Sequence, residues 1–348
     1  MLSKAVKERI VIEVGSHWTK VIVGASLGKK KKNGLVNENI RIREAFFVKT
    51  PKAQIPESDM MDLDNKRYVP AFDKFILVRE VKEMLRERRI KTEKVIITLD
   101  DRSVISREMV LPKVDKDKLK GIVSFELQEF LPIDPKRYII DFKIMEVLKV
   151  GEIEKYNLNV AALPNDEGEF YQSFVQELRK DAFALDLTSN SISKLFDRNM
   201  KINGRLREIE SKTIAYVDIG YSNVNLHIIE HGVLKFTRNI EGGMGSLSTA
   251  NDTKLINGEE SLELIRKWIN SLEQMIRFFT SREADREIDQ VFIYGGGSMI
   301  PGIEAHFSEI MGTPTEIIKE LDNLDLHKDL KDFSLPLYLN TVASLIRR

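Results

Sequence analysis

The chain has 348 residues, of which 42% are hydrophobic and 31% are charged, a balance typical of a folded protein with a sizeable core. Its 54 basic residues equal its 54 acidic residues. A protein that coats nucleic acid needs an excess of positive charge, so we expect no nucleic-acid partner. The sequence contains no cysteine, which excludes disulfides, thiolate metal sites and thiol nucleophiles.

Neither end of the sequence shows a targeting segment. The beginning, MLSKAVKERIVIEVG, carries charges where a signal peptide has an apolar stretch. No run of about 18 uncharged apolar residues occurs, so we expect no membrane-spanning helix. The closing segment LPLYLNTVASLIRR has apolar residues at helical spacing, which favours a core helix, with a helix lying on a membrane as the alternative. We therefore expect a cytoplasmic protein without direct membrane insertion.

The first hundred residues predict a strand-rich unit with one helix. Strands are expected at 10–14, 20–26, near 41–48 and at 94–99. A Gly-Ser-His-Trp turn joins the first two strands, and an amphipathic helix is predicted over 73–88. The polar segment from Pro51 to Pro70 has no periodicity and is expected to be a loop.

A different pattern begins near Asp101 and predicts a small α+β module inserted into a larger domain. Its expected elements are a strand over 103–111, a helix from Asp115 to about Phe130, strands at 138–147 and 156–162, and a helix over 169–179. Asp115 is a favourable N-cap, and the Leu131-Pro132 pair ends the first helix.

An internal repeat is the most informative feature of the sequence. Residues 10–24 read IVIEVGSHWTKVIVG, and residues 214–232 read IAYVDIGYSNVNLHIIEHG. Each has an apolar strand, an acidic residue, a glycine-containing turn and a second apolar strand. The acids are Glu13 and Asp218, and the glycines are Gly15 and Gly220. A duplicated element of this kind indicates two related lobes that face each other.

A glycine-rich element follows further along the chain. In QVFIYGGGSMIPGIEAHFSEIMG, a strand over 290–294 leads into three glycines, and Pro301 stands where a helix would begin. Before it, a long amphipathic helix is predicted over 261–279, because apolar residues recur on one helical face. A single strand–acid–glycine turn is common in proteins. Two such turns followed by a glycine-rich strand–turn–helix are much less frequent by chance.

The three elements favour a nucleotide site between the lobes. Backbone N–H groups of turns that contain Gly and Ser can cradle phosphate oxygens. Lys20 could reach a phosphate, while Glu13 and Asp218 could hold Mg²⁺ through water, because this ion dehydrates reluctantly. The predicted lining residues are Gly15, Ser16, His17, Trp18, Lys20, Asp218, Gly220, Ser222, Asn223, Gly242, Gly243, Gly295, Gly296, Gly297 and Met299. Each glycine taken alone has an alternative explanation, a turn that needs a positive φ.

Other chemical motifs have less support. The pattern G-x-x-x-x-G-K-[ST] is absent, which excludes an ordinary P-loop, and the absence of G-x-S-x-G leaves a nucleophile elbow without support. His227 and His231 are expected on a strand and its turn, where a four-residue spacing does not place them on one face. We therefore predict no histidine metal site.

The three elements resemble the phosphate-1, phosphate-2 and adenosine motifs of the actin-like ATPase superfamily. The inserted module is similar to that of the type IV pilus assembly PilM family, a relative of the cell-division protein FtsA. The similarity lies in Met109–Pro112, Phe125-Glu126, Leu131-Pro132-Ile133 and Asp141, and in the segments KFTRNIEGG, GGGSMIPGI and TVASLIRR. It extends over nearly the whole chain.

This resemblance implies an actin-like (ribonuclease H-like) two-lobed α/β fold with an inserted small α+β subdomain. The first lobe would comprise 1–100 and 183–210, the inserted subdomain 101–182, and the second lobe 211–348. The implied function is that of a cytoplasmic scaffold of the pilus inner-membrane platform, which binds ATP and Mg²⁺ and grips the cytoplasmic N-terminal tail of a PilN-like membrane protein. Other platform proteins are further candidate partners. The tail is expected in a groove formed by Phe125, Phe130, Leu131 and Ile133.

Four departures from the family pattern bear on catalysis. They are Glu13 in place of the usual Asp, the bulky His17 and Trp18 in the first turn, Glu273 and Gln274 in place of basic residues, and Ser344 in place of a common Gly. No residue is marked as a general base, so we expect little or no ATP hydrolysis. Three alternatives stay open: a sugar-kinase-type enzyme of the same fold, an FtsA-like membrane-associated filament protein, and a pseudo-ATPase with an empty cleft.

Overall fold

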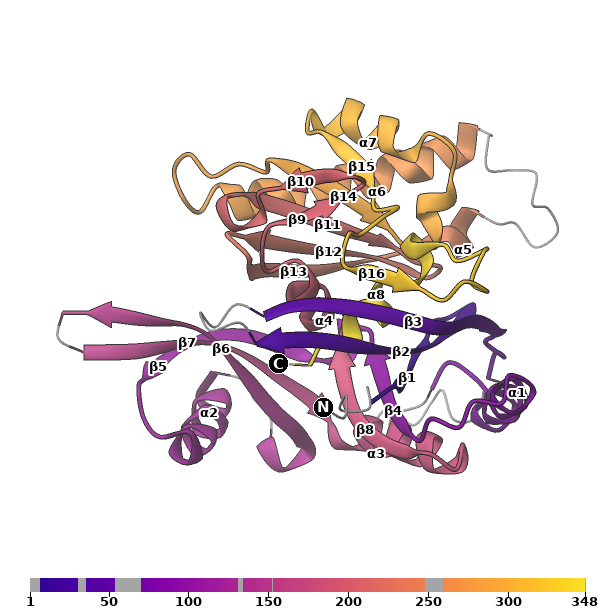
Figure 1. Cartoon of the computed structure of the whole chain (residues 1–348). Helices are drawn as coiled ribbons and strands as arrows, with labels where there is room; N and C mark the ends of the chain where they lie inside the picture. Colours follow the sequence, from indigo (N-terminus) through magenta and orange to yellow (C-terminus); the bar gives the residue numbers. More distant parts are fainter. Residues whose placement is uncertain are drawn as a thin grey trace, which may run out of the picture.

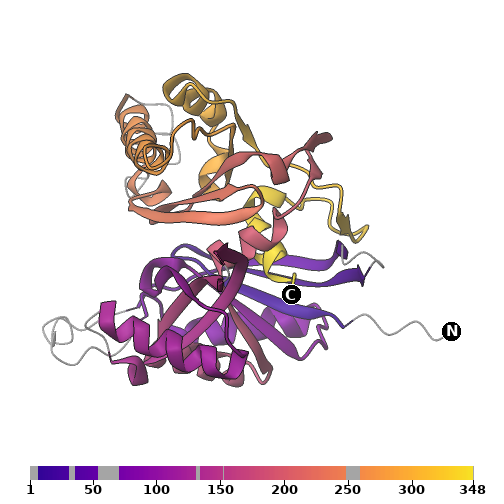
Figure 2. The ribbon, with the colours of Figure 1, turned by 90° about the vertical axis from the view of Figure 1, so that its left-hand side faces the viewer.

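The computed structural model describes residues 7–30, 36–53, 70–130, 134–151, 153–247 and 259–347. Two lobes are stacked one above the other, and a small module extends from the lower lobe (Figure 1). The last helix, α8 (Leu335–Ser344), lies between the two lobes, as the view in Figure 2 shows. Within the described ranges, no helix is both long enough and apolar enough to cross a bilayer.

The first lobe contains a six-stranded sheet of order β16-β3-β2-β1-β4-β8. The strands are β1 (Arg9–Val14), β2 (Trp18–Lys30), β3 (Val36–Lys49), β4 (Lys94–Leu99), β8 (Asp181–Leu187) and β16 (Leu324–Leu326). Helices α1 (Lys74–Glu87) and α3 (Asn165–Glu177) bury apolar side chains against one face of this sheet. Because the other face is also covered, β1 and β4 read as nearly continuous apolar runs.

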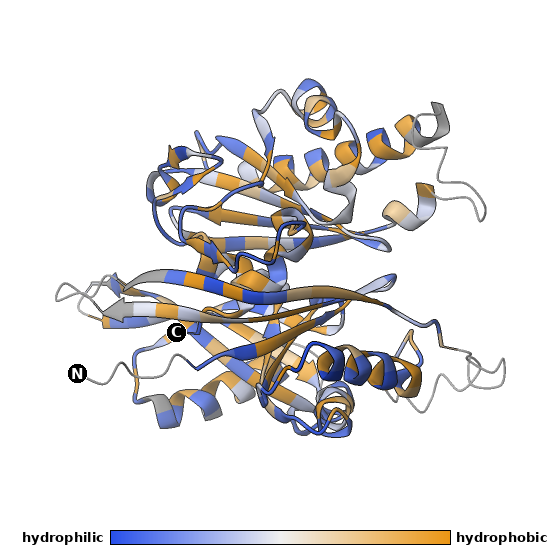
Figure 3. Ribbon diagram, turned by 45° about the vertical axis from the view of Figure 1, so that its right-hand side comes forward, coloured by the Kyte–Doolittle hydropathy of each residue, from blue (hydrophilic) through white to orange (hydrophobic). Residues whose placement is uncertain are grey.

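The second lobe contains a five-stranded sheet of order β13-β12-β11-β14-β15. The strands are β11 (Thr213–Ile219), β12 (Asn223–Glu230), β13 (Val233–Glu241), β14 (Gln290–Tyr294) and β15 (Thr315–Ile317), and the helices are α5 (Met244–Leu247), α6 (Glu259–Thr280) and α7 (Ile303–Met311). Figure 3 shows apolar strands inside both lobes. The pairs β1–β2 and β11–β12 are both antiparallel hairpins, so the sequence repeat corresponds to the same hairpin in each lobe.

The inserted module is a three-stranded antiparallel sheet with one helix. Its strands are β5 (Ile105–Pro112), β6 (Tyr138–Val150) and β7 (Ile153–Pro164), in the order β5-β7-β6. Helix α2 (Lys116–Phe130) packs on this sheet and contributes Leu119, Val123 and Leu127 to a small separate core. Short 3₁₀ turns η2 (Asp101–Ser103) and η3 (Pro135–Arg137) precede β5 and β6. The predicted two-lobed fold with an inserted α+β subdomain is therefore confirmed.

Helix α3 and strand β16 do not pack in the lobe or subdomain to which the predicted domain boundaries assign them. Helix α3 falls within the predicted subdomain, but its residues Tyr171, Phe174 and Val175 are buried in the first-lobe core. Strand β16 falls within the predicted second lobe, but it pairs in parallel with β3 of the first. Local patterns do not reveal which neighbouring sheet an element packs on. We propose that the inserted subdomain ends at Pro164 and that the C-terminal segment serves both lobes.

Helices α4 (Thr188–Leu195) and α8 pack together and join the lobes. One continuous core cluster includes Val11 of the first sheet and Tyr216 of the second, together with most of α8. The Ser344 hydroxyl lies 2.8 Å from the hydroxyls of Thr98 and Ser191, so α8 is held by buried polar contacts as well. The strands β9 (Met200–Ile202) and β10 (Arg205–Arg207) and the turn η4 (Ile209–Ser211) lead from α4 into the second lobe. The closing segment is therefore a core helix.

Candidate functional site

The turns of the two related hairpins meet between the lobes. One turn separates β1 from β2, and the equivalent turn separates β11 from β12. The hydroxyl oxygens of Ser16 and Ser222 lie 2.8 Å apart, and the His17 ring stacks on Tyr221 with centroids 4.4 Å apart. The structure thus brings together the two turns that the sequence repeat assigned to facing lobes.

Four polar side chains converge behind these turns. The Lys20 ammonium of β2 donates to Oε1 of Glu13 at the end of β1, at 3.0 Å. The side-chain amide of Asn340 in α8 donates to the same Glu13 oxygen at 3.2 Å and to Oδ2 of Asp218 at 2.8 Å. The two acids predicted from the repeat therefore share one centre. Asn340 was not predicted, because nothing in the sequence near it indicates that α8 reaches the site.

The charges of this centre depend on one another. Burial raises the pKa of Asp218 to about 6, although the Lys20 ammonium opposes the rise. Burial by itself would lower the pKa of Lys20, but the carboxylates of Glu13 and Asp218 outweigh it and raise that pKa above its ordinary value. Lys20 is consequently a cation at neutral pH. It was predicted to reach a phosphate, and the structure shows it in an ion pair with Glu13.

Two buried oxygen atoms at this centre, Oε2 of Glu13 and Oδ1 of Asn340, have no hydrogen-bond partner. A cation or a donating water molecule would satisfy them, and carboxylate and amide oxygens are suitable ligands for Mg²⁺. Within the described part of the chain, no three acidic or histidine side chains are arranged to hold a metal ion directly. The donor set is therefore suited to Mg²⁺ held through water.

Three of the predicted lining glycines are required by contacts inside the protein. A Cβ atom on Gly295, whose φ is +84°, would overlap Oδ1 of Asp218, and one on Gly297 would overlap the Ile219 side chain. A Cβ on Gly243 would lie 2.6 Å from a backbone oxygen of the second turn. Close packing of the three elements, without any ligand, is enough to explain these glycines.

The other predicted residues differ in exposure. Asn223 is buried and donates to the Asp100 carboxylate at 2.7 Å. Trp18 and Met299 are 46% and 59% exposed, so large apolar surfaces face solvent beside the first turn and beside the glycine-rich turn η6 (Gly296–Met299). Gly242, with φ +96°, has the Trp268 indole nitrogen 3.6 Å from its Cβ position.

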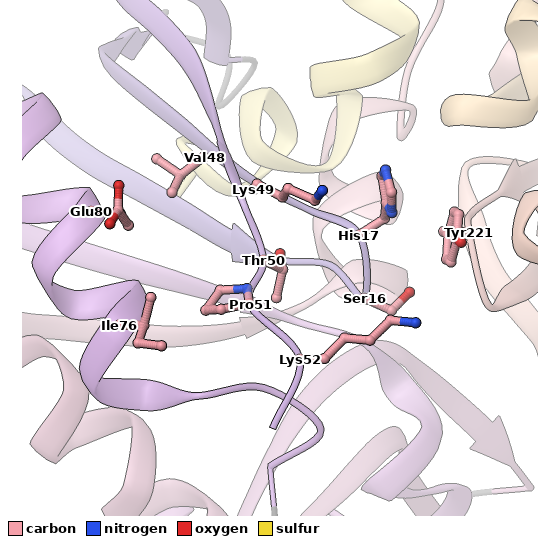
Figure 4. A pocket seen from close by; sticks show the side chains of 10 residues that line it. All are labelled: Ser16, His17, Val48, Lys49, Thr50, Pro51, Lys52, Ile76, Glu80 and Tyr221. Carbon is pink, nitrogen blue, oxygen red and sulfur yellow. The ribbon is translucent and has the colours of Figure 1, made fainter. Parts of the chain in front are cut away.

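A cavity of about 520 Å³ opens beside the first turn. It is lined by Ser16, His17, Val48, Lys49, Thr50, Pro51, Lys52, Ile76, Glu80 and Tyr221 (Figure 4). Figure 4 shows the amines of Lys49 and Lys52 on the side of the cavity that faces His17 and Tyr221. Burial, followed by the charges of these two lysines, lowers the pKa of His17, which keeps its ring neutral at pH 7. The charged side chains that line the cavity at this pH are therefore Lys49, Lys52 and Glu80.

The two lysines were not predicted as site residues. Lys49 pairs with Trp18 in the β2–β3 ladder, and the Thr50 N–H donates to the His17 carbonyl at 3.0 Å. The end of β3 therefore lies against the first turn. Extending the predicted hairpin register by a few residues would have located these lysines, because antiparallel pairing places the end of the third strand beside the start of the second.

The family model for type IV pilus assembly protein PilM matches residues 68–253, which is more than half of the chain. The chain belongs to the PilM family. The match includes the second turn and the whole inserted module, which was the part of the sequence with the most specific resemblance. A search of curated protein sequences gives no match to this PilM-family chain.

One solved structure shows the fold of this PilM-family chain, and others are similar to it more distantly. A PilM–PilN type IV pilus biogenesis complex is similar over 98% of this chain and 99% of that chain, at 17% identity and a TM-score of 0.72. The ethanolamine utilization protein EutJ from Carboxydothermus hydrogenoformans is 12% identical over 97% and 89% of the two chains, with a TM-score of 0.47. MreB5 of Spiroplasma citri bound to ADP is 11% identical over 97% and 95%, with a TM-score of 0.44. The similarity to the PilM–PilN complex shows that this chain has the same two-lobed α/β fold.

Of the predicted partner groove, only Phe125 is described. It is 59% exposed on α2, on the side opposite the helix residues that fill the module core. The side chains of Phe130, Leu131 and Ile133 lie outside the described residues, as does most of the predicted loop from Pro51 to Pro70. Ile139, near the start of β6, follows the groove residues 130–133 in sequence. It is 47% exposed and is therefore a second apolar side chain at the surface of the module.

Proposed function

We propose that this PilM-family chain is a cytoplasmic scaffold of the type IV pilus inner-membrane platform. In this proposal it is held at the inner membrane through the cytoplasmic N-terminal tail of a PilN-like membrane protein, and other platform proteins would be further partners. Membership of the family supports the pilus role. The PilM–PilN complex supports such a partner, because its PilM component has the same fold.

The observation that carries the tail proposal is apolar surface exposed on the inserted module. Phe125 and Ile139 stand in sequence on either side of residues 131–133, and both expose about half of their surface. The small core of the module is already filled by other side chains of α2 and of the sheet. Exposed apolar side chains that the core does not need favour the uptake of a short apolar peptide.

The tail proposal is tested with the full chain and a labelled synthetic peptide of the PilN-like tail from the same genome. We expect Phe125→Asp and Ile139→Asp each to weaken binding by about tenfold or more, because losing one buried apolar anchor costs about 1.5–3 kcal/mol. Ile153→Asp is the matched control, since Ile153 is 61% exposed at the other end of the same hairpin. Equal affinity of all three variants would show that the tail binds elsewhere.

We also propose that ATP and Mg²⁺ bind between the lobes. The facing turns at Ser16 and Ser222 supply backbone N–H groups, and the unsatisfied oxygens beside Asp218 suit a hydrated cation. Lys49 and Lys52 add positive charge at the mouth of the same cleft. These features support a phosphate-bearing ligand at the turns.

Nucleotide binding is tested by thermal unfolding with and without Mg-ATP. A ligand at about 100 times its dissociation constant stabilises the fold by roughly 2.7 kcal/mol. We expect such a shift for the native chain and for Asp325→Asn, a control at a side chain that is 58% exposed. We expect a much smaller shift for Asp218→Asn, which removes a buried carboxylate of the centre. No shift in the native chain at millimolar Mg-ATP would refute nucleotide binding and leave the tail proposal standing.

Hydrolysis in this proposal is weak or absent, so the chain is not primarily an enzyme. A general base needs a free oxygen within hydrogen-bonding reach of the attacking water. Here Lys20 and Asn340 bond to Oε1 of Glu13, and Asn340 bonds to Oδ2 of Asp218. The unpartnered Oε2 of Glu13 would face the hydrated Mg²⁺ in this proposal, so it would not receive a proton from the attacking water. Steady multiple-turnover phosphate release that disappears in Asp218→Asn would contradict this part of the proposal.

A further inference from the structure

A second cavity, of about 750 Å³, lies between the inserted module and the second lobe. Its walls come from β5, β6 and β7 of the module and from β13 of the second lobe. In Figure 1, β13 lies on the side of the second lobe that faces the first lobe and the module. It shares no lining residue with the cavity at the first turn, and its volume is in the range of known ligand-binding clefts.

Positive charge predominates in this cleft. The cationic lining residues are Arg102, Arg107, Lys235, Arg238 and Arg282, and the acidic ones are Asp101 and Glu108. The acids are already engaged on the protein side. Asp101 accepts hydrogen bonds from the hydroxyls of Thr188 and Ser189, and Glu108 accepts one from the Asn157 amide. Arg102 and Lys235 pair with Asp100 and Glu146, which lie outside the lining. The acids of the lining do not balance the positive charge of the remaining arginines.

Two of the arginines are placed to receive an anion. The Arg238 guanidinium lies over the Phe236 ring at 4.7 Å from its centroid, and the Arg282 guanidinium lies over Phe278 at 4.3 Å. Neither arginine has an ion pair with a carboxylate in the part of the chain that the structure describes. Arg238 donates one N–H to the Thr237 carbonyl at 2.7 Å. Stacking on a ring leaves the remaining guanidinium N–H groups able to pair with a carboxylate.

The walls of the cleft also carry strands with an unpaired edge. Strand β13 ends the five-stranded sheet, and β5 ends the sheet of the module. An extended peptide can pair with such an edge through its main chain, while alternate side chains reach one wall. Lys235 of β13 contacts Glu146 of β6 at 3.4 Å, so the two walls are close enough to be bridged by single side chains.

We propose that this cleft binds an acidic segment of a partner protein in an extended conformation. The segment carries carboxylates at alternate positions, which pair with Arg238 and Arg282, while its backbone lies along an exposed strand edge. The site is separate from the proposed tail site, because neither Phe125 nor Ile139 lines it.

The test uses the full chain and a fluorescent peptide that alternates Glu with Val, measured by anisotropy at low and high salt. An otherwise identical peptide with Gln in place of Glu is the control ligand. We expect the Glu peptide to bind, the Gln peptide to bind at least about tenfold more weakly, and the affinity for the Glu peptide to fall with salt. The protein variants give the second part of the test. The double variant Arg238→Ala/Arg282→Ala is expected to lose about tenfold or more in affinity for the Glu peptide. Arg205→Ala, at a side chain that is 76% exposed in the same lobe, is expected to leave it unchanged.

Four results would overturn the proposal. The first is equal affinity for the Glu and Gln peptides, and the second is full affinity in the double variant when circular dichroism shows that it is folded. The third is displacement of the Glu peptide by Mg-ATP or by inorganic tripolyphosphate, if binding of that competitor also requires Arg238 and Arg282. This result would make the cleft a phosphate site. Loss of binding in Phe125→Asp would instead assign the peptide to the tail site and would likewise contradict the proposal.

Discussion

Asp218 is buried beside one cation and one further acid, so its neighbours determine its charge. Lys20 and the Asn340 amide favour the carboxylate, but burial outweighs them and raises its pKa to about 6. Burial also raises the pKa of Asp101 to about 6, although Asp101 accepts hydrogen bonds from α4. Asp218 in the candidate site and Asp101 in the cleft between the module and the second lobe thus titrate just below neutral pH.

This titration predicts how stability depends on pH. The ordinary pKa of an Asp is 3.8, so between about pH 4 and 6 the folded chain holds protons at Asp218 and Asp101 that the unfolded chain has lost. The free energy of unfolding therefore falls as pH rises through this window, by at most about 1.4 kcal/mol per pH unit for each group. Asp218→Asn should reduce this slope, and Asp325→Asn should not. Urea unfolding at several pH values measures it, and an unchanged slope in Asp218→Asn would show that Asp218 has an ordinary pKa.

Among the elements, the glycine-rich turn after β14 contacts both helix α8 and strand β11. The Gly295 N–H donates to the Pro336 carbonyl of α8 at 2.9 Å, and the Gly295 backbone packs on Asp218. Its φ of +84° and ψ of −177° lie in a region that only glycine adopts readily. The turn therefore positions the acid, whether or not it also contacts a ligand.

Alanine substitutions at Gly295 of this turn and at Gly302, the N-cap of α7, separate backbone strain from crowding. Gly302 has φ +76° but no atom within 4 Å of its Cβ position, so Gly302→Ala should cost only about 1–2 kcal/mol of stability. In Gly295→Ala the new methyl group also overlaps Asp218, which adds about 1–3 kcal/mol. Chemical denaturation of both variants gives the comparison. If they are equally stable, the close packing of Gly295 on Asp218 is not tight in solution.

Features of the fold and the site that are set by neighbouring residues can be predicted from the sequence. Features that depend on contacts between residues far apart in the chain cannot. The two hairpins were predictable because their apolar strands, acids and glycine turns are local and occur twice, at Glu13 and Asp218. The packing side of α3 and the partner strand of β16 were not, since both depend on contacts distant in sequence. Asn340 was missed for the same reason, because it reaches Glu13 from 327 positions away.

Across the whole molecule, a chain of hydrogen bonds links the two turns to Asp100 and η2, where the chain enters the inserted module. Ser16 of the first turn contacts Ser222 of the second, whose hydroxyl donates to Oδ1 of Asn223 at 3.4 Å. The Asn223 amide donates to Asp100 at 2.7 Å, and Asp100 in turn caps η2, accepting from the backbone N–H of Arg102 at 3.0 Å. A second branch continues from Asn223 through Asn225 to Asn239, which lines the cationic cleft. The lobes and the module therefore share one polar network.

If ATP and the tail both bind as proposed, this network predicts that each changes the affinity for the other, by the same factor in both directions. Coupling energies of this kind are about 1–3 kcal/mol, so we expect the affinity for the tail peptide to change about fivefold or more when Mg-ATP is added. Asn223→Ala removes the bond between the second lobe and Asp100 and should abolish most of this change while each ligand still binds alone. Asn159→Ala is the matched control, because Asn159 bonds only to Ser106 within the module among the contacts described. Titration of the tail peptide with and without Mg-ATP measures the coupling in all three proteins. Undiminished coupling in Asn223→Ala would mean that the lobes and the module communicate by another route, most directly through the packing of α4 and α8.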